Sequence, residues 1–566
     1  MSKNAKRLLS FLLVVVLAVG VLLAGCGNKN SSSSSSNTSK QSETATNSKD
    51  PQNLHFKSDK PLEFTMLYSD HPNYPYKSDW LLWKAIKDAT NVTLKLTIVP
   101  MSDYSQKRSL LISSGQAPEI IPKTYPGQEI PFVTSGAILP ISDYIDQMPN
   151  FSREVKEWGL QNELDQLKQA DGKFYVLPGL HEEFVHDRAL AIRQDIFEKN
   201  NIPIPNTWDE LESALKKLKE IYPNTYPLSD RWKGQALLLM AAPAFGIPVS
   251  DSDGQLTWSG ANGGKTEADT SMVLYNSSKD DWEFYPTSQE YKDMLTYFNR
   301  LVKEGLLDPA SFTQTDDQAI QKFVTGKSFV IMTNTQEIEK MKKQMDQTLG
   351  KGNYKVTRIL PLAGPKGAVT AGSRLENGIM ISAKAKDDPN FPQLLKFVDW
   401  LWYSEAGETL TKWGVEGVTY QKVNGKFQLM PDVNYMNLNP SGTKDLQKDY
   451  GFSGGVFALI YGGPKDLGES MMTDDVKKFN KELNDSMKFF PPAPPVRLTE
   501  SQREQVNMLS QPLTDYVNQM MYKFIIGVAS IDKDWDSYVQ QCRAKGVDQL
   551  VKIINDVYKS TKDKMK

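Results

Sequence analysis

The sequence predicts an α/β protein of two lobes, each built on a parallel-rich sheet flanked by helices. Strands and helices alternate from residue 62 to residue 121, and the same alternation returns from residue 189 onward. Compact turns between strand and helix are typical of a parallel sheet covered by helices. The chain has 566 residues, which is more than one ordinary hydrophobic core holds, so we expect at least two cores.

Apolar runs and helix breakers define the first elements. An alternating strand at 92–99 follows a helix that carries Trp80, Trp83 and Ile86 on one face. A helix over 103–114 stops at the glycine that follows it, because glycine readily ends helices. In order, the expected elements are a strand at 62–68, the tryptophan helix, a strand at 92–99, a helix at 103–114 and a strand at 119–121.

The middle and the end of the chain repeat this order. Thr207 and Glu210 form a capping box, in which the two side chains satisfy the first free N–H groups of a helix. Asp251–Gly254 indicates the turn of a small hairpin. The other expected elements are a strand at 189–193, helices at 291–302 and 319–326, a strand at 328–332, and helices at 394–403 and from 500 to the end.

The N-terminus has the features of a secretory signal. Basic residues precede an apolar run from Leu8 to Leu23, and small residues lie just before Cys26. This segment resembles the lipobox of bacterial lipoproteins, in which the cysteine thiol receives a diacylglyceryl group and becomes the mature N-terminus. The alternative, a transmembrane helix, usually needs about 20 apolar residues, more than this run supplies.

The signal predicts where the mature protein works. Removal of residues 1–25 from the 566-residue chain leaves 541 residues. Residues 26–60 are then a lipidated cysteine and a Ser/Asn-rich tether that has too few apolar residues to form a core. We expect the protein to lie on the outer face of the cell membrane, held by its lipid anchor.

Charge, cysteine and histidine content exclude several classes of function. The chain has 66 Lys and Arg against 68 Asp and Glu, so it lacks the basic excess that nucleic-acid binding demands. With Cys26 lipidated, the other cysteine, Cys542, has no partner for an internal disulfide. No histidine lies close to Cys542 in the sequence, so a structural role is favoured over that of a nucleophile. The four histidines form no metal-ligand pair at helical spacing, which argues against catalytic zinc.

Short motifs in a fixed order resemble those of the extracellular solute-binding proteins, family 1, which serve ABC importers. Each motif is weak alone, but their order from about residue 62 to residue 420 is specific. The motifs are Ser114-Gly115 with Pro118-Glu119-Ile120, Asp171–Pro178, Ile192–Asp195 with Thr207–Leu211, Leu301–Pro309, Phe323–Lys327 and Gly414–Val418. Glu119 departs from the aspartate that is usual in the first motif.

The resemblance implies a maltose-binding-protein-like fold, in which a hinge of several crossing segments joins two lobes and the ligand binds between them. We expect lobe 1 to comprise 61–184 and 372–415, and lobe 2 to comprise 188–366 and 420–566. The similar proteins are large lipoproteins of Gram-positive bacteria that bind sugars, uronate-rich ones among them. The expected function is a monomeric receptor that delivers an oligosaccharide to the transmembrane subunits of an ABC permease, without catalysis.

No cofactor or metal is expected. Related alginate-binding proteins carry a calcium loop soon after the helix that corresponds to Thr207–Leu211. In this chain the same place, Tyr222–Ser229, supplies almost none of the carboxylate oxygens that a hard cation needs.

A sugar site needs aromatic surfaces and planar hydrogen-bonding groups, which in this architecture lie in loops at strand ends and in hinge crossings. Tyr125 and Trp232 are the leading aromatic candidates. Arg374 is the strongest candidate for an acidic sugar, because a guanidinium pairs bidentately with a carboxylate. The expected ligand-binding residues are Asp70, His71, Tyr74, Tyr125, His181, Glu182, Arg188, Arg231, Trp232, Arg374, Glu376 and Trp413.

Other functions are compatible with the same sequence. A secreted enzyme acting on polysaccharide needs two carboxylates across one bond, although no segment resembles a glycosidase motif. A sugar-sensing subunit for a membrane kinase would use the same closure of two lobes, so the sequence does not separate it from a transport receptor. For His71, His181 and Arg188, the alternative to ligand contact is a solvated or ion-paired loop charge.

Overall fold

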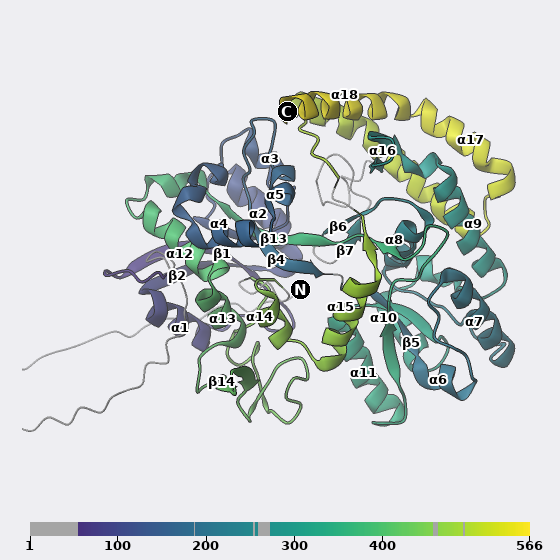
Figure 1. Ribbon diagram of the computed structural model, residues 1–566, viewed down its shortest axis with the longest axis horizontal. Coiled ribbons are helices and arrows are strands. Elements are labelled where there is room, and N and C mark those ends of the chain that lie inside the picture. Colours follow the sequence, from purple (N-terminus) through teal and green to yellow (C-terminus); the bar gives the residue numbers. More distant parts are fainter. Residues whose placement is uncertain are drawn as a thin grey trace, which may run out of the picture. The chain divides into compact units, whose positions relative to one another are not determined.

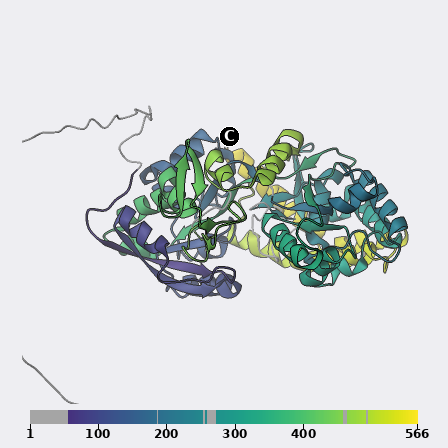
Figure 2. The same ribbon diagram turned by 90° about the horizontal axis from the view of Figure 1, so that it is seen from below.

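The computed structural model describes residues 55–185, 187–252, 255–257, 272–456, 462–490 and 493–565. All of them belong to one compact unit, Pro51–Lys566. The predicted signal peptide, Cys26, the tether as far as residue 54 and the turn residues Asp253 and Gly254 lie outside the described residues. Within the unit, two large hydrophobic cores define two lobes, and the colours of Figure 2 separate the segments that build them.

The first lobe is built on a five-stranded sheet in the order β2-β1-β3-β13-β4. β1 pairs in parallel with β2 and β3, whereas β13 runs antiparallel to β3 and β4. Along β1, Phe64 and Met66 enter the large core and Leu67 enters a smaller one on the opposite face. The strands are β1 Leu62–Asp70, β2 Val92–Pro100, β3 Ile120–Thr124, β4 Leu177–Val185 and β13 Ser373–Ile381.

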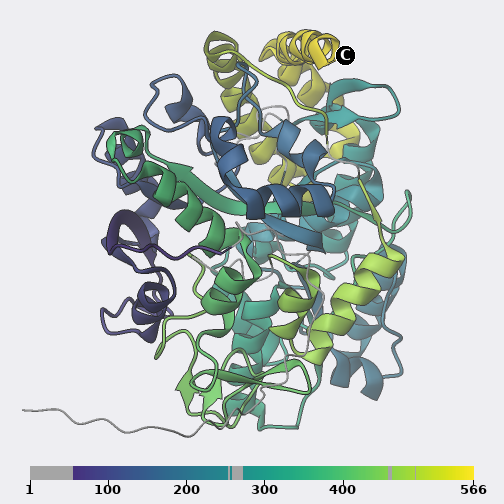
Figure 3. The ribbon, with the colours of Figure 1, turned by 60° about the vertical axis from the view of Figure 1, so that its left-hand side comes forward.

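Helices from distant parts of the sequence cover this sheet. In Figure 3, the green helices α12 and α13 lie among purple and blue segments, although they come much later in the chain. Their apolar side chains join those of α1 and α4 in the large core, and α2 covers the smaller core. The helices are α1 Leu81–Thr90, α2 Tyr104–Ser113, α3 Ile130–Val133, α4 Pro149–Glu157, α5 Gln161–Gln166, α12 Phe391–Tyr403, α13 Glu405–Trp413 and α14 Lys465–Ser470.

The second lobe has a three-stranded sheet in the order β10-β5-β11. β5 (Ala189–Arg193), β10 (Val330–Thr333) and β11 (Val356–Ile359) pair antiparallel throughout. The expectation of a parallel-rich sheet is therefore wrong for this lobe. Short, fully buried strands such as β5 do not reveal the direction of their neighbours, which the chain path decides.

Helices surround the second sheet, and the predicted helices after the Thr207 cap, at 291–302, at 319–326 and at the C-terminus are confirmed. In Figure 1, α16 lies beside α9, and the yellow helices α17 and α18 pack against α16. The helices are α6 Gln194–Lys199, α7 Trp208–Ile221, α8 Gln235–Phe245, α9 Gln289–Lys303, α10 Asp316–Val324, α11 Thr335–Leu349, α15 Asp474–Ser486, α16 Glu500–Ile525, α17 Ile531–Ala544 and α18 Val547–Met565.

Two local predictions need comment. The Thr207 hydroxyl accepts the Glu210 N–H at 3.0 Å, but the Glu210 carboxylate accepts the Asn206 N–H at 2.7 Å, so only half of the capping box forms. Ser250–Ser252 (β6) and Gln255–Thr257 (β7) pair antiparallel, which confirms the two strands of the predicted hairpin.

The described chain passes between the two lobes at three places: between Leu180 and Leu190, between Ala371 and Leu375, and between Met471 and Phe479. At the second crossing, Gly372 lies beneath the stacked rings of Phe184 and Phe489, whose centroids are 4.7 Å apart. A Cβ at Gly372 would lie 2.7 Å from either ring, so the crossing requires glycine here.

One lobe boundary differs from the prediction. Tyr420, Tyr435, Leu446, Phe452 and Met471 pack in the core of the first lobe, whereas the sequence placed 420–566 in the second. The chain returns to the second lobe only at α15 and the C-terminal helices. None of the helices in the described ranges combines the length and the apolar character that a membrane crossing requires.

Candidate functional site

A left-handed turn in the second lobe presents Trp232. Trp232, Lys233 and Gly234 have φ angles of 52°, 54° and 70°, a conformation that costs free energy for the two residues with a Cβ. A Cβ at Gly234 would lie 2.5 Å from the Phe312 ring, so tight packing fixes the turn. Strained backbone held by its surroundings is typical of binding sites.

Buried polar groups anchor this turn. Asp230 is fully buried, and its carboxylate accepts the Met332 N–H at 2.9 Å. Its own N–H donates to the Ser311 hydroxyl at 2.8 Å, and its carbonyl accepts from the Gln314 amide at 2.6 Å. Burial raises the pKa of Asp230 to about 7. The turn that carries Trp232 is thus attached through Asp230 to β10 and to the segment that precedes α10.

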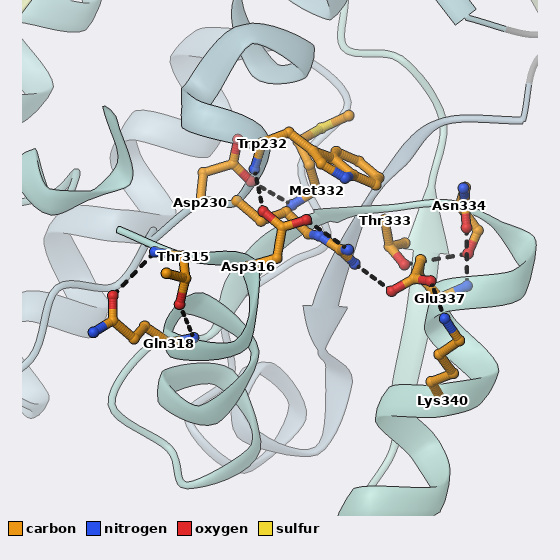
Figure 4. Close-up of polar contacts among 11 residues, drawn as sticks. Asp230, Trp232, Thr315, Asp316, Gln318, Met332, Thr333, Asn334, Glu337 and Lys340 are labelled. Carbon is orange, nitrogen blue, oxygen red and sulfur yellow. Dashed lines mark hydrogen bonds and ion pairs between the residues drawn. The ribbon is translucent and has the colours of Figure 1, made fainter. Parts of the chain in front are cut away.

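A chain of ion pairs continues from the turn to α11. Arg231 donates to Asp316 at 3.2 Å and to Glu337 at 2.8 Å, and Glu337 also accepts from Lys340 at 2.6 Å. Asp316 accepts the Trp232 N–H at 2.9 Å as well. Figure 4 shows Asp316 and Glu337 approaching the turn from α10 and α11. Although burial raises the pKa of Glu337, its hydrogen bonds from Lys340 and Arg231 bring it below its ordinary value.

Two guanidinium groups lie over the Trp232 ring, with Arg231 at 4.2 Å and Arg188 at 4.5 Å from its centroid. Arg188 is half-buried and belongs to the first crossing between the lobes. Arg188, Arg231 and Trp232, each selected from the sequence as a ligand candidate, thus lie together. We call Arg188, Arg231, Trp232, Glu337 and Lys340 the second-lobe wall.

A second cluster lies at the ends of β1 and β3 in the first lobe. The His71 ring stacks on Tyr74, with centroids 4.3 Å apart and planes inclined by 5°. The Tyr74 hydroxyl accepts the Gly455 N–H at 3.3 Å. Lys123 lies over the Tyr125 ring at 5.7 Å from its centroid. We call Asp70, His71, Tyr74, Lys123 and Tyr125 the first-lobe wall.

The two walls lie within electrostatic reach of each other. Burial lowers the pKa of His71, and the positive charges of Lys123 and Lys340 lower it further. Lys340 belongs to α11 of the second lobe, so its charge acts on the first-lobe wall. Asp70 has the opposite but smaller effect on His71, and its carboxylate accepts the Tyr76 N–H at 2.7 Å.

A small pocket that opens to solvent is lined by residues of both lobes. We call it the interlobe pocket. Its second-lobe residues include Thr335 and Glu339 of α11, the helix that also carries Glu337 and Lys340. Asn437 of the first lobe donates to Glu339 across the junction. The lining residues are Thr335, Ile338, Glu339, Arg358, Tyr435, Met436, Met471, Met472, Thr473, Asp475 and Val476.

The structure places three predicted residues at another junction. His181 is 4% exposed, and its Nε2 lies 2.9 Å from the Glu376 carboxylate. Glu182 accepts the Lys465 N–H at 2.7 Å. These groups connect β4 to β13 and to the start of α14.

Behind His181 lies a buried carboxyl pair, Glu154 and Glu408, with Lys412. Burial raises the pKa of Glu408 to about 7, and burial together with the charge of Glu408 raises that of Glu154 well above its ordinary value. Burial lowers the pKa of Lys412. This cluster belongs to the interior of the first lobe.

Two predicted ligand residues, Arg374 and Trp413, make their contacts with other residues of the protein. Arg374 donates to Glu163 at 2.9 Å and to the Trp158 carbonyl at 2.8 Å, so its guanidinium already has a carboxylate partner. Trp413 is 2% exposed, stacks on Phe427 and donates to the Ser470 hydroxyl at 3.0 Å. Its placement in the core excludes ligand contact and corrects the prediction.

Sequence reasoning missed Lys123, Asp316, Glu337, Lys340 and the interlobe pocket. Lys123 lies two residues before Tyr125, near the end of β3, so its closeness to a selected residue was a usable signal. Nothing local distinguishes Glu337 or Lys340 from other charges on an amphipathic helix. Among the described residues, no group of three or more His, Cys, Asp or Glu side chains could hold a metal ion.

Comparison with known proteins gives the family. Residues 81–407 match the sequence profile described as bacterial extracellular solute-binding protein. The Bacillus subtilis lipoprotein LipO is 24% identical over 495 residues, covering 85% of this chain and 89% of its own. The polygalacturonan/rhamnogalacturonan-binding protein YtcQ of the same organism is 23% identical over 97% of this chain and 98% of its own.

A third relative and a solved structure agree with these matches. The fructooligosaccharide ABC transporter substrate-binding protein FusA of Streptococcus pneumoniae is 24% identical over 81% of this chain and 82% of its own. The crystal structure of the alginate-binding protein AlgQ2 without calcium matches with a TM-score of 0.65 at 20% identity, covering 90% of this chain and all of that one. This likeness shows the two-lobed solute-binding fold.

Proposed function

Because the chain belongs to the bacterial extracellular solute-binding protein family, we propose that it captures an oligosaccharide between its lobes and delivers it to an ABC permease. The observation that carries the proposal is the junction itself. An aromatic and charged wall from each lobe meets there, and a small pocket is lined by residues of both lobes. Sugars offer hydroxyl groups and a weakly apolar ring face, which such surfaces match.

The names of the relatives support a sugar as the ligand. YtcQ is named for polygalacturonan and rhamnogalacturonan, FusA for fructooligosaccharide, and AlgQ2 for alginate. All three are polymers or oligomers of sugars, and two of the names denote acidic ones. We therefore propose an oligosaccharide, with uronate-containing ones among the candidates.

The ligand would act by bridging the two lobes. A ligand that contacts both walls favours the closed arrangement over the open one by its differential affinity. The second-lobe wall would offer Trp232 and Arg188, and the first-lobe wall His71, Tyr74 and Tyr125. The permease would then recognise the closed form.

The place of action follows from the N-terminus. We propose that Cys26 carries the lipid and holds a monomeric binding unit at the outer face of the membrane. The match to the lipoprotein LipO supports this anchor. The predicted tether of residues 26–60 is too long at its end, because Phe56 already packs in the core of the first lobe.

We further propose that the ligand leaves unchanged, so that the protein is not an enzyme. A glycosidase needs one carboxyl group with a raised pKa as general acid. The pocket carboxylates are engaged instead: Glu339 accepts from Lys342 at 2.8 Å and from Asn437, and Asp475 accepts from Thr473. Although burial raises the pKa of Asp475, the Thr473 hydrogen bond and the Lys342 charge bring it below its ordinary value.

A ligand screen tests this function. A sugar present at 100 times its Kd stabilises the folded protein by about 2.7 kcal/mol, so thermal shift identifies binders among neutral and acidic oligosaccharides. Small-angle scattering should then show compaction with the same sugar, and no new reducing ends should appear. Turnover of the sugar would favour the polysaccharide enzyme. If the sugar compacts the protein but is not taken up, and no permease genes lie next to the gene of this protein, the sugar-sensing role would be favoured.

A further inference from the structure

We propose that the first-lobe wall contains a subsite for an anionic sugar substituent, a carboxylate or a sulfate ester, which pairs with the Lys123 ammonium. The proposal rests on the proposed oligosaccharide-binding function and specifies its ligand. It also transfers the recognition of charge from Arg374, the residue expected from the sequence, to a lysine at the junction between the lobes.

The first argument is the absence of an acidic partner. Within the described parts of the chain, no carboxylate forms an ion pair with Lys123, which is half-buried and lies over Tyr125. Two cations of the second-lobe wall form ion pairs within the protein: Arg231 with Asp316 and Glu337, and Lys340 with Glu337. A partly buried ammonium without a counter-charge loses hydration and gains little in return. An anionic ligand would remove that cost.

The second argument is backbone strain. Lys123 has a φ of 54°, in the left-handed region that a side chain disfavours. Its carbonyl accepts the Arg108 guanidinium at 2.6 Å, and Arg108 also donates to Gln128 at 2.8 Å. Arg108 is buried, so its hydrogen bond fixes the backbone of Lys123 while the Lys123 ammonium stays at the junction. Strain maintained in this way is typical of a functional position.

The third argument is the shape of the surroundings. A Cβ at Gly455 would lie 3.3 Å from the Lys123 Nζ and 3.5 Å from the Tyr74 hydroxyl, so these two groups flank one bare stretch of backbone. The Tyr125 ring lies on another side of Lys123, and His71 stacks on Tyr74. A sugar that pairs its anionic group with Lys123 would therefore find hydroxyl and ring surfaces beside it.

The fourth argument is the local potential. The charged groups that act on His71 are Lys123, Lys340 and Asp70, and the two lysines have the larger effects. Asp70 is held by the Tyr76 N–H. The net effect of these charges at His71 is therefore positive, although the whole chain has a formal net charge of −2. A positive potential of this kind concentrates anionic ligands.

The test compares matched sugars on two variants. Calorimetry measures the affinities for α-1,4-linked trigalacturonate, its methyl ester, neutral galactotriose and sulfated galactotriose. The wild-type protein should bind trigalacturonate, or the sulfated sugar, about tenfold more tightly than the uncharged counterpart. Lys123→Met keeps the length of the side chain and should abolish most of that preference while leaving the uncharged sugar's affinity unchanged. Lys95→Met, at an exposed lysine of β2, is the matched control and should change nothing.

The outcomes separate this proposal from the one it rests on. If neutral and anionic sugars bind equally well, the anion subsite is wrong and the receptor function stands. If none of the sugars binds, both proposals are overturned. A preference for only the carboxylate or only the sulfate identifies the anion, and the preference should shrink at about 1 M salt, where the Debye length is about 3 Å. Thermal melting of Lys123→Met verifies that the variant is folded.

Discussion

The two walls that meet between the lobes use charge in different ways. In the second-lobe wall, the charges of Arg231 and Lys340 are neutralised by Asp316 and Glu337. In the first-lobe wall, Lys123 has no such partner among the described residues. The paired charges fix the position of Trp232, whereas the unpaired one stays available to a ligand. An ion pair within the protein thus indicates a positioning role, and a cation without one indicates recognition.

Arg374 gives the largest test of this distinction. It pairs with Glu163, and both side chains are mostly buried. Arg374→Met should lower the free energy of unfolding by about 3 kcal/mol, because it leaves a buried carboxylate unpaired. The affinity of the folded protein for sugar should not change. Denaturant titration and calorimetry measure the two quantities, and Arg374→Met with Glu163→Gln should recover part of the stability. A tenfold loss of affinity with normal stability would restore Arg374 as a ligand residue.

Trp232 is expected to show the opposite behaviour. Trp232→Ala removes an aromatic surface from the junction, and contacts of this kind contribute about 2 kcal/mol, or roughly 30-fold in affinity. Stability should fall less than in Trp413→Ala, which removes a fully buried ring and should cost about 3–5 kcal/mol with no change in affinity. Equal affinities of Trp232→Ala and wild-type protein would exclude Trp232 from the site.

Asp316 tests whether the second-lobe ion pairs position Trp232. Asp316→Ala removes the acceptor of the Trp232 N–H and one partner of Arg231. We expect about fivefold weaker binding of sugar, equivalent to about 1 kcal/mol, and a shifted tryptophan fluorescence spectrum. Asp316→Asn keeps an acceptor and should restore most of the affinity. If both variants bind like wild type, the turn is rigid without Asp316.

The smallest expected effect is a pH dependence from His71. Its pKa lies below the ordinary value of about 6.5 because of burial and the charges of Lys123 and Lys340. An anion on Lys123 offsets those charges and raises the pKa, so binding takes up a proton. Affinity for trigalacturonate should therefore rise about two- to threefold from about pH 7.5 to about pH 5.5, where uronates remain ionised. His71→Asn should show no such rise, and a flat wild-type profile would contradict the prediction.

Much of the fold follows from periodicity in the sequence. The alternating strand β2 and the amphipathic helices α7 and α9 are visible in the chain because one face of each is apolar. The direction of pairing around β5 cannot be seen in the sequence, because every residue of that strand is buried. The segment from Tyr420 to Met471 has little regular structure, so its lobe is decided by where Tyr435, Leu446 and Phe452 pack.

The candidate site was predicted less completely, for a physical reason. Loop position selected Arg231 and Trp232, which lie in contact, and their contact with a ligand stays a prediction. It also selected Arg374, whose partner Glu163 is 211 residues away in the sequence. Whether a charge is paired depends on tertiary contacts, so residue type and loop position alone favoured Arg374 and passed over Lys123.

The buried carboxyl pair has a consequence for where this protein can work. Glu154 and Glu408 have pKa values above those they would have in the unfolded chain, for Glu408 about 7. Between about pH 4.5 and 7 the folded state holds more protons at these groups, so their contribution to stability is greatest in mild acid and declines toward neutrality. An extracellular protein is exposed directly to the pH of the surrounding medium. Through these two carboxyl groups, a fall in the pH of the medium would stabilise the first lobe rather than destabilise it.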